Sequence, residues 1–213
     1  MWKKYKGIII ITTIICLLPM VAGLILWNQL PEQIVTHWGA NGEPDGWSSK
    51  AVAVFGLPLL MAAIQLGCSF AGKFDKAFED QPKQMMQLML WICPVLSLVL
   101  HSLTYAMALG YDMLNVGMLM SLLFGTLFVV IGNYLPKCRQ NKSLGIRIPW
   151  TLANEGNWNA THRLGGWTIM LAGVVLLATA FLGYFLIFVI VTLVAILIPI
   201  VYSYVYYRKH KAD

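Results

Sequence analysis

Charged residues are scarce in this sequence, and their scarcity excludes an ordinary soluble protein. Only 11% of the 213 residues are Asp, Glu, Lys or Arg, and 59% are hydrophobic. A soluble domain carries about a quarter charged residues. Long uncharged apolar runs indicate membrane-spanning helices, because lipid offers the backbone no hydrogen-bonding partner. We therefore interpret the chain as an integral membrane protein.

Six apolar runs contain no Asp, Glu, Lys or Arg. The predicted spans are residues 7–27, 51–71, 87–109, 114–134, 165–182 and 185–206. Each is close to the roughly 20 residues that an α-helix needs to cross a bilayer. The expected fold class is an all-α integral membrane protein with six transmembrane helices.

The basic residues are distributed unevenly between the connections. Fourteen of the 15 Lys and Arg residues fall on one side of the predicted membrane, and only Lys50 falls on the other. Because cytoplasmic loops carry an excess of Lys and Arg, that side is expected to be cytoplasmic, with both termini inside. The net charge of +6 then reflects topology. We expect anionic membrane lipid as a partner and no direct contact with nucleic acid.

Motifs of the common enzyme and metal-binding classes are also missing. The sequence has no HExxH, GxSxG or Walker motif, no CxxC pair, and no two carboxylates within one span. Three of its four cysteines lie in predicted spans and the fourth, Cys138, lies on the cytoplasmic side. A disulfide framework is therefore not expected. We predict no enzymatic activity, no catalytic residue, no cofactor and no metal.

The outer connection, residues 28–50, does not have the composition of a flexible linker. It mixes Trp, His, Asn, Gly and Pro, with turn signals at Asn41-Gly42 and at Pro44-Asp45-Gly46. Two interpretations stay open: His37, Glu43 and Asp45 bind a cation, or His37 and Asp45 hydrogen-bond the turn itself. The candidate ligand-binding residues are His37, Trp38, Asn41, Glu43, Asp45 and Trp47.

The inner connection, residues 135–164, has a similar composition. It is interpreted either as a docking site for a cytoplasmic partner or as a Trp-rich membrane anchor. Arg163 is expected to pair with Glu155 or to bind a lipid phosphate. The candidate partner-binding residues are Arg147, Pro149, Trp150, Asn154, Trp158, Thr161, His162 and Arg163.

The two connections resemble each other, which suggests an internal repeat. Each begins with Asn-x-Leu-Pro, at residues 28–31 and 133–136, and each continues with two Trp residues. The first three spans start inside and the last three start outside, as in an inverted repeat. The predicted halves are residues 1–110 and residues 111–213, and their relation as a 3+3 inverted repeat is a hypothesis.

Two polar residues lie deep in the predicted spans. His101 is the one ionisable group at depth, and Gln65 lies in the second span. Such residues are functional candidates by default, although hydrogen bonds between helices are the simpler interpretation. A transporter would instead place both in a cavity near the midplane.

The two connections carry a set of short motifs: Leu30-Pro31, His37-Trp38, Asn41-Gly42, Pro44-Asp45-Gly46 and Lys50, then the run 144–152, Trp158 and Thr161-His162-Arg163. These motifs resemble those of the SdpI immunity-protein family. The resemblance implies a multi-pass protein of the bacterial plasma membrane that gives immunity to a secreted toxic peptide of the Sdp type. It also implies a receptor that sequesters a small cytoplasmic autorepressor at the membrane. A transporter or exporter of a peptide or small amphiphile is the alternative.

Overall fold

The computed structural model describes residues 2–39, 41–71, 75–111 and 115–210. Within these residues, six helices are long and apolar enough to cross a membrane. The predicted fold class, a helical membrane protein with six transmembrane helices, is thereby confirmed. Lys73 and Lys211, which entered the predicted charge distribution, lie outside the described residues.

The chain folds into two compact units. Unit 1 comprises Met1–Phe74 and Gln87–Leu114, and unit 2 comprises Asp75–Met86 and Asn115–Asp213. The segment 75–86 therefore packs with the C-terminal unit, although it lies within the predicted half 1–110. Each unit has three long helices and a long connection between its first two. Their relation as an inverted repeat stays a prediction.

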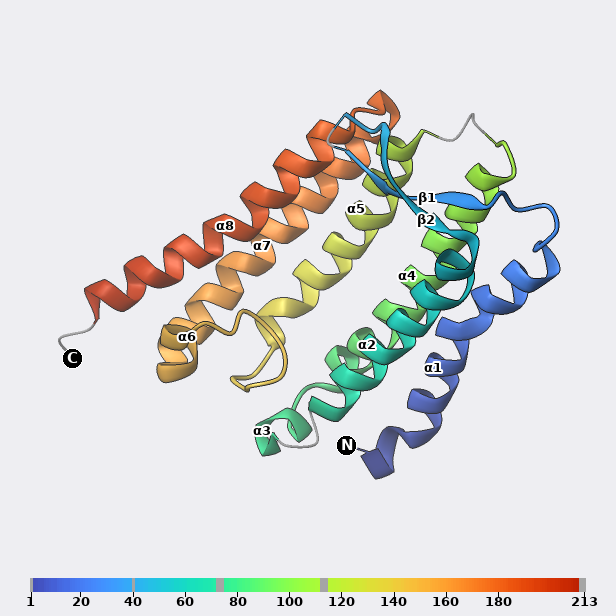
Figure 1. The fold of residues 1–213 in the computed structure, drawn as a ribbon. Coiled ribbons are helices and arrows are strands. Elements are labelled where there is room, and N and C mark those ends of the chain that lie inside the picture. The colour runs from blue at the N-terminus through green and yellow to red at the C-terminus, as the bar shows by residue number, and fades with distance from the viewer. Residues whose placement is uncertain (1, 40, 72–74, 112–114, 211–213) are drawn as a thin grey trace. The chain divides into compact units, whose positions relative to one another are not determined.

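Unit 1 consists of three long helices and a β-hairpin (Figure 1). Its elements are α1 (Trp2–Ile25), β1 (Gln33–Trp38), β2 (Pro44–Ser49), a π-helical turn (Val52–Gly56), α2 (Leu57–Ala71) and most of α4 (Lys83–Ala108). The strands pair antiparallel. The register of the two strands shifts on both sides of His37, as it does at a β-bulge. The all-α prediction did not include this hairpin, although the composition of the connection had indicated an ordered segment with turns and not a flexible linker.

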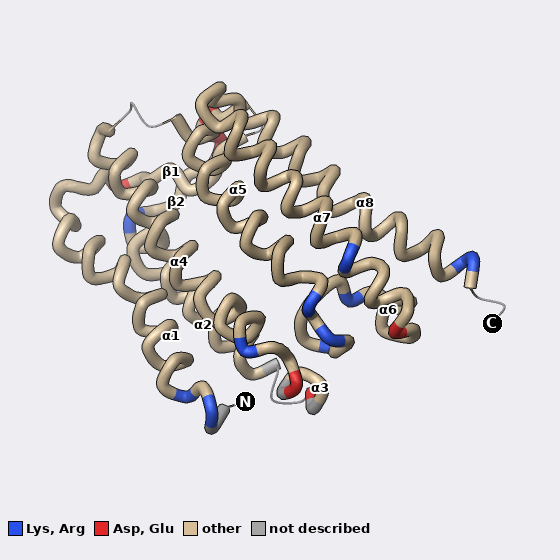
Figure 2. Tube along the Cα trace, turned by 180° about the vertical axis from the view of Figure 1, so that it is seen from behind, with Lys and Arg blue, Asp and Glu red and all other residues tan. Residues whose placement is uncertain are grey.

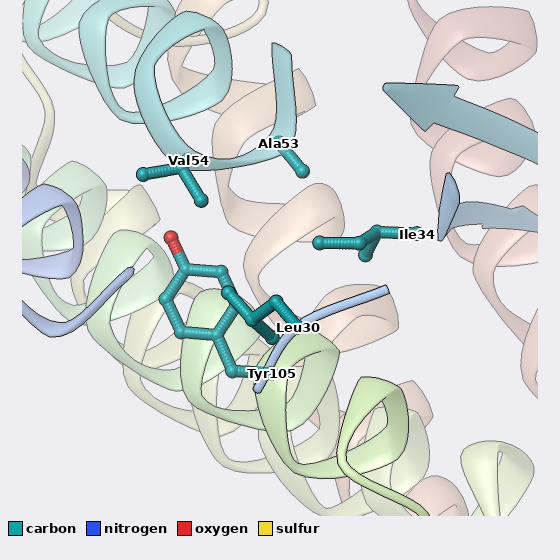
Figure 3. Packing of buried hydrophobic residues seen from close by; sticks show 5 residues of the cluster. All are labelled: Leu30, Ile34, Ala53, Val54 and Tyr105. Carbon is teal, nitrogen blue, oxygen red and sulfur yellow. The ribbon is translucent and has the colours of Figure 1, made fainter. Parts of the chain in front are cut away.

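A small apolar cluster holds the base of the hairpin against the helices of unit 1. It joins Leu30 before the hairpin, Ile34 on β1, Ala53 and Val54 before α2, and Tyr105 on α4. Figure 3 shows the Tyr105 hydroxyl pointing toward Val54. That hydroxyl donates a hydrogen bond to the Pro19 carbonyl of α1 at 3.2 Å. The hairpin is therefore seated on a fixed platform.

Unit 2 contains α5, α7 and α8 as its long helices, which run beside one another in Figure 1. Its elements are α3 (Lys76–Glu79), α5 (Val116–Tyr134), a 3-10 turn (Leu135–Lys137), α6 (Pro149–Ala153), α7 (Glu155–Thr179), a second 3-10 turn (Ala180–Leu182) and α8 (Phe185–Lys209). Figure 2 shows Lys and Arg of this unit gathered around α6 and at the end of α8.

Glycines bring the backbones of α5 and α7 together. A Cβ at Gly132 would lie 2.7 Å from the Gly166 carbonyl oxygen, and one at Gly173 would lie 2.6 Å from that of Gly125. These distances exclude any larger side chain without movement of the helices. In lipid, where no hydrophobic force draws helices together, such close packing is a principal source of helix association. The seam fixes α7, and with it the inner connection.

The structure corrects two boundaries. The prediction that Asp45 lies in a turn is wrong, because residues 44–46 begin β2 and the turn is made at Asn41-Gly42. The predicted start of the fifth span at residue 165 is also wrong, because α7 begins at Glu155. The Asn154 side chain accepts a hydrogen bond from the Asn157 backbone N–H at 2.7 Å and so caps this helix.

Candidate functional site

The outer connection is an ordered hairpin with a tight tip. The Asn41 side chain accepts a hydrogen bond from the Glu43 backbone N–H at 3.1 Å, and Gly42 has a φ of 82°. A left-handed residue at this position favours glycine. At the base of the hairpin, Thr36 and Ser48 exchange a 2.9 Å side-chain hydrogen bond across the strands. The candidate residues on this hairpin are therefore held in a defined arrangement.

His37 and Asp45 face each other across the two strands. The distance from His37 Nδ1 to Asp45 Oδ1 is 2.5 Å, and both side chains are exposed. Gly46 makes room for this approach, since a Cβ there would lie 2.8 Å from His37 Cβ. The contact corresponds to the second interpretation of these residues, a hydrogen bond within the connection. Among the described residues, no group of three or more His, Cys, Asp or Glu side chains is arranged to hold a metal ion.

Trp47 and Trp38 differ in how they are placed on the hairpin. Trp47 on β2 is 57% exposed and offers a large apolar surface outside the helices. Trp38 at the end of β1 is half-buried, and within the described residues its indole N–H is buried without a hydrogen-bond acceptor. Trp47 is therefore the aromatic residue of this hairpin that is best placed to contact a ligand.

Lys50 clamps the hairpin to the end of α1. It is the single basic residue of the outer connection, yet it is only 7% exposed. Its ammonium group donates to the Trp27 carbonyl at 3.2 Å, lies 2.9 Å from a Glu32 carboxylate oxygen, and sits 5.2 Å from the centre of a Trp27 ring. These three contacts satisfy the buried charge. The Lys50 of the sequence motif thus has a structural role.

The inner connection is held by a buried pair of rings at the start of α7. Trp158 and His162 are fully buried and stack with their centroids 4.0 Å apart. The Trp158 indole N–H donates to the Cys138 carbonyl at 2.8 Å. His162 Nε2 accepts from the Ile146 backbone N–H at 3.0 Å. His162 Nδ1 therefore carries the proton, which it donates to the Trp158 carbonyl at 2.8 Å.

A second polar chain joins α7 to α8. The Thr161 hydroxyl donates to the Asn157 side-chain oxygen at 2.9 Å, and the Asn157 amide donates to the Ser203 carbonyl at 3.0 Å. On α6, the Trp150 indole N–H donates to the Ser203 hydroxyl at 2.8 Å, and its ring stacks on Tyr207. One turn of α8 therefore anchors both α6 and the start of α7.

The segment before α4 also belongs to this site, and the sequence analysis missed it. Gln81 forms two 2.9 Å hydrogen bonds with the backbone of Arg139, accepting from its N–H and donating to its carbonyl. The Asp75 carboxylate accepts from the Lys142 backbone N–H at 2.6 Å and from the Ser143 hydroxyl at 3.2 Å. No motif in the sequence links these distant segments. The one signal available was that the side chains of Gln81 and Asp75 can each form several hydrogen bonds.

The predicted inner residues therefore divide into two groups. Trp158, Thr161 and His162 are fully buried in contacts within unit 2. Asn154 is exposed and caps α7, and the role of these four residues in binding a partner stays a prediction. The remaining exposed residues are Arg147, Pro149 and Arg163, with Trp150 half-buried.

The two intramembrane candidates take part in packing within unit 1. The Gln65 amide donates to the Thr12 hydroxyl at 2.8 Å and to the Leu90 carbonyl at 2.9 Å, and so joins α1, α2 and α4. His101 Nδ1 donates to the Ser97 carbonyl of its own helix at 2.6 Å. The link between helices at this level comes from the Ser97 hydroxyl, which donates to the Cys16 carbonyl. His101 Nε2 is buried without a partner among the described residues.

Two protein-family models match the chain, one across the outer connection and one across most of the inner connection. Residues 14–62 match a family model described as a domain of unknown function, DUF1648, and residues 137–203 match the SdpI/YfhL protein family. The chain is 29% identical over 203 residues to the immunity protein SdpI of Bacillus subtilis (strain 168), an alignment that covers 94% of this chain and 96% of that protein. No solved structure matches the chain. The resemblance predicted from the motifs is thereby confirmed.

Proposed function

We propose that this chain, a relative of the SdpI/YfhL proteins, is an integral membrane immunity protein that protects its cell from a secreted toxic peptide of the Sdp type. The observation that supports this most is the similarity to an immunity protein along nearly the whole chain. The six membrane-length helices agree with action at the membrane. The relative is an immunity protein by name, which gives no support to an enzymatic function.

The test is survival of a toxin-sensitive bacterium that lacks immunity proteins of its own. Cells expressing the full chain are challenged with the purified peptide toxin and compared with cells carrying the empty vector. Resistance is expected only in the expressing cells. Equal killing of both cultures, with the protein present in the membrane fraction, would contradict the proposal.

The hairpin is the proposed contact for the toxin. It is ordered, it presents Trp47 and the His37–Asp45 pair to the outside of the fold, and it is fixed to the helices by Lys50. An amphipathic peptide is expected to bury Trp47, because aromatic residues contribute most of the binding energy at many interfaces. With both termini cytoplasmic, as we propose from the basic residues, this hairpin faces the arriving toxin.

Substitutions on the hairpin test this assignment. Trp47→Ala and His37→Ala are expected to lower survival under toxin while leaving the amount of protein in the membrane unchanged. Tyr111→Ala is the matched control, since Tyr111 is an exposed aromatic residue of unit 1 outside the hairpin. Full resistance in both hairpin variants would rule out the hairpin as the toxin contact.

The inner connection is the proposed platform for a cytoplasmic repressor. Arg147 and Pro149 are exposed, and the Arg147 guanidinium donates to the Lys142 carbonyl at 2.6 Å, which fixes its direction. Rigid exposed groups of this kind suit a docking surface, because little conformational entropy is lost on binding. Arg147→Ala is expected to abolish recruitment of the repressor to membranes in a pull-down. Lys209→Ala, a basic residue at the end of α8, serves as the control.

The transporter alternative required Gln65 to line a cavity. Gln65 is instead 1% exposed, and both of its amide hydrogens are directed to groups on neighbouring helices. Its side chain therefore fills a helix interface. We favour the immunity function, in which the helices connect an outer contact to an inner one.

A further inference from the structure

A hollow lies beside Arg163, on the outside of unit 2. It is lined by Pro136, Asn159, Ala160 and Arg163 and has a volume of about 340 Å³. Its lining residue Pro136, in the turn after α5, is in close contact with α7, since a Cβ at Gly166 would lie 2.5 Å from Pro136 Cγ. The hollow is therefore a fixed feature of the helix pair.

The polar groups at this hollow are basic or neutral, and they are free. Among the described residues, neither the Arg163 guanidinium nor the Asn159 amide forms a hydrogen bond or an ion pair, and no carboxylate lines the hollow. Lys137, the residue after Pro136, is exposed, with its ammonium group 4.7 Å from the centre of the Tyr134 ring. A guanidinium with free donors matches a phosphate group, which it binds through two parallel hydrogen bonds.

The exposed face of α7 continues from this hollow into an apolar surface. Asn159, Arg163, Trp167 and Leu171 are spaced four residues apart and therefore share one face of the helix. Trp167 and Leu171 are each 64% exposed. The sequence of amide, guanidinium, indole and aliphatic side chain follows the polarity of a bilayer from headgroup to acyl chains.

We propose that this hollow is a binding site for the phosphate of an anionic phospholipid, with Arg163 as the main donor, Asn159 as a second donor and Lys137 as a nearby positive charge. The acyl chains would lie along Trp167 and Leu171. A lipid is favoured over free phosphate because the apolar face continues directly from the charged one. This proposal assigns Arg163, one of the candidate partner-binding residues, to a lipid and leaves Arg147 and Pro149 to the proposed repressor contact, and it does not depend on the immunity function.

Lipid retention by the full chain in mild detergent tests this proposal. Native mass spectrometry measures the binding of palmitoyl-oleoyl phosphatidylglycerol, with phosphatidylcholine of the same acyl chains as reference. The wild type is expected to retain phosphatidylglycerol preferentially, and Arg163→Gln is expected to weaken its binding roughly fivefold, the effect of one basic residue at a lipid surface. Arg147→Gln removes the same charge from the same unit but does not line the hollow, so it is expected to bind as the wild type does.

Several results would overturn the proposal. Equal retention of the two lipids by the wild type would do so, and so would an equal loss of phosphatidylglycerol binding in Arg163→Gln and Arg147→Gln. Displacement of the lipid by millimolar inorganic phosphate would indicate a site for free phosphate. Asn159→Ala provides a second variant if Arg163→Gln does not fold, and unchanged lipid binding in it would also count against the site. Loss of repressor recruitment in Arg163→Gln with unchanged lipid binding would assign this residue to a protein partner.

Discussion

His162 Nε2 accepts a hydrogen bond from the backbone N–H of Ile146 at 3.0 Å, sixteen residues away along the chain. The histidine is fully buried and stacks on Trp158. Its other nitrogen donates to the Trp158 carbonyl. One neutral imidazole therefore joins the start of α7 to the segment before α6. At this point the sequence motif Thr161-His162-Arg163 therefore has a structural role: it locks the inner connection onto α7.

Replacement of His162 by Phe tests the lock. His162→Phe keeps a ring against Trp158 but leaves the buried Ile146 N–H without an acceptor, which costs about 1–3 kcal/mol. A lower thermal midpoint in detergent is expected, together with faster proteolysis of residues 138–148. Trp167→Phe, on the exposed face of the same helix, is the control and is expected to melt as the wild type does. An unchanged midpoint in His162→Phe would show that the lock adds nothing to stability.

Gly145 is required by the same lock. Its φ is 103°, and a Cβ would lie 2.4 Å from His162 Nε2 and 3.1 Å from the Trp158 ring. Gly145→Ala is therefore expected to lower the free energy of unfolding by about 1–3 kcal/mol through backbone strain alone. The added methyl group would also displace the His162 imidazole, which lowers the stability further.

The matched control for Gly145 is a glycine in open space. A Cβ at Gly67 on α2 would meet nothing within 4 Å, so Gly67→Ala is expected to be neutral or stabilising, by about 0.5–1 kcal/mol. The comparison is made by thermal unfolding of both variants in the same detergent. Equal midpoints for the two variants would show that Gly145 does not need to be glycine.

The helices were predictable from the sequence because lipid imposes one dominant rule on them. Uncharged runs of about 20 residues have few alternatives in a bilayer, so the six spans were found. The start of α7 was missed for the same reason, since residues 155–164 are polar and hydropathy places the start of the span too late, at residue 165 instead of Glu155. The spacing of the residues does indicate that the helix starts earlier. Its buried face contains Trp158, Thr161, His162 and Gly165, which are three or four residues apart.

The candidate site was less predictable because its contacts connect distant segments. The sequence showed which residues are unusual, but not which of them face inward. Trp158 and Arg163 belong to the same motif, yet one is fully buried and the other is exposed. Gln81 carries no motif at all and still pairs with the backbone of Arg139. Such pairings depend on tertiary structure, which a composition or a spacing does not contain.

Lys50 is expected to be needed for an ordered hairpin. Lys50→Met keeps most of the buried side-chain volume but removes the hydrogen bond to the Trp27 carbonyl and the contact with Glu32. The hairpin should then detach from α1 more often, which is measured as faster cleavage of residues 33–49 by a protease added outside the cell. Toxin resistance should fall in parallel if the hairpin is the toxin contact.

The control for Lys50 is its own partner. Glu32 is highly exposed, and exposed ion pairs contribute about 0–1 kcal/mol, so Glu32→Gln is expected to change protease cleavage little. Equal cleavage of the wild type and Lys50→Met would show that the apolar cluster around Tyr105 is sufficient to hold the hairpin.

Cys138 is expected to be unreactive in the folded protein. It follows the last residue of α5's span, packs with Met85 and Trp158, and is almost fully buried. Burial raises the pKa of its thiol to about 11, against the opposing effect of the Asn141 amide, from an ordinary value of 9.0. Since the thiolate is the reacting form, alkylation by N-ethylmaleimide at pH 7.5 should be negligible until the protein is denatured.

The same pKa gives the sign of a stability change with pH. The folded protein holds the Cys138 thiol proton more tightly than the unfolded chain does. The contribution of this thiol to the free energy of unfolding is therefore fully present below pH 9 and is lost as the pH rises toward about 11. A variant with the other three cysteines replaced by Ala isolates the effect, and Cys138→Ala in that background is the control. The Cys138-containing variant should lose more of its thermal midpoint than the control between pH 8.5 and pH 10.5. Parallel losses in the two, or rapid labelling of native Cys138 at pH 7.5, would show that this thiol is open to solvent.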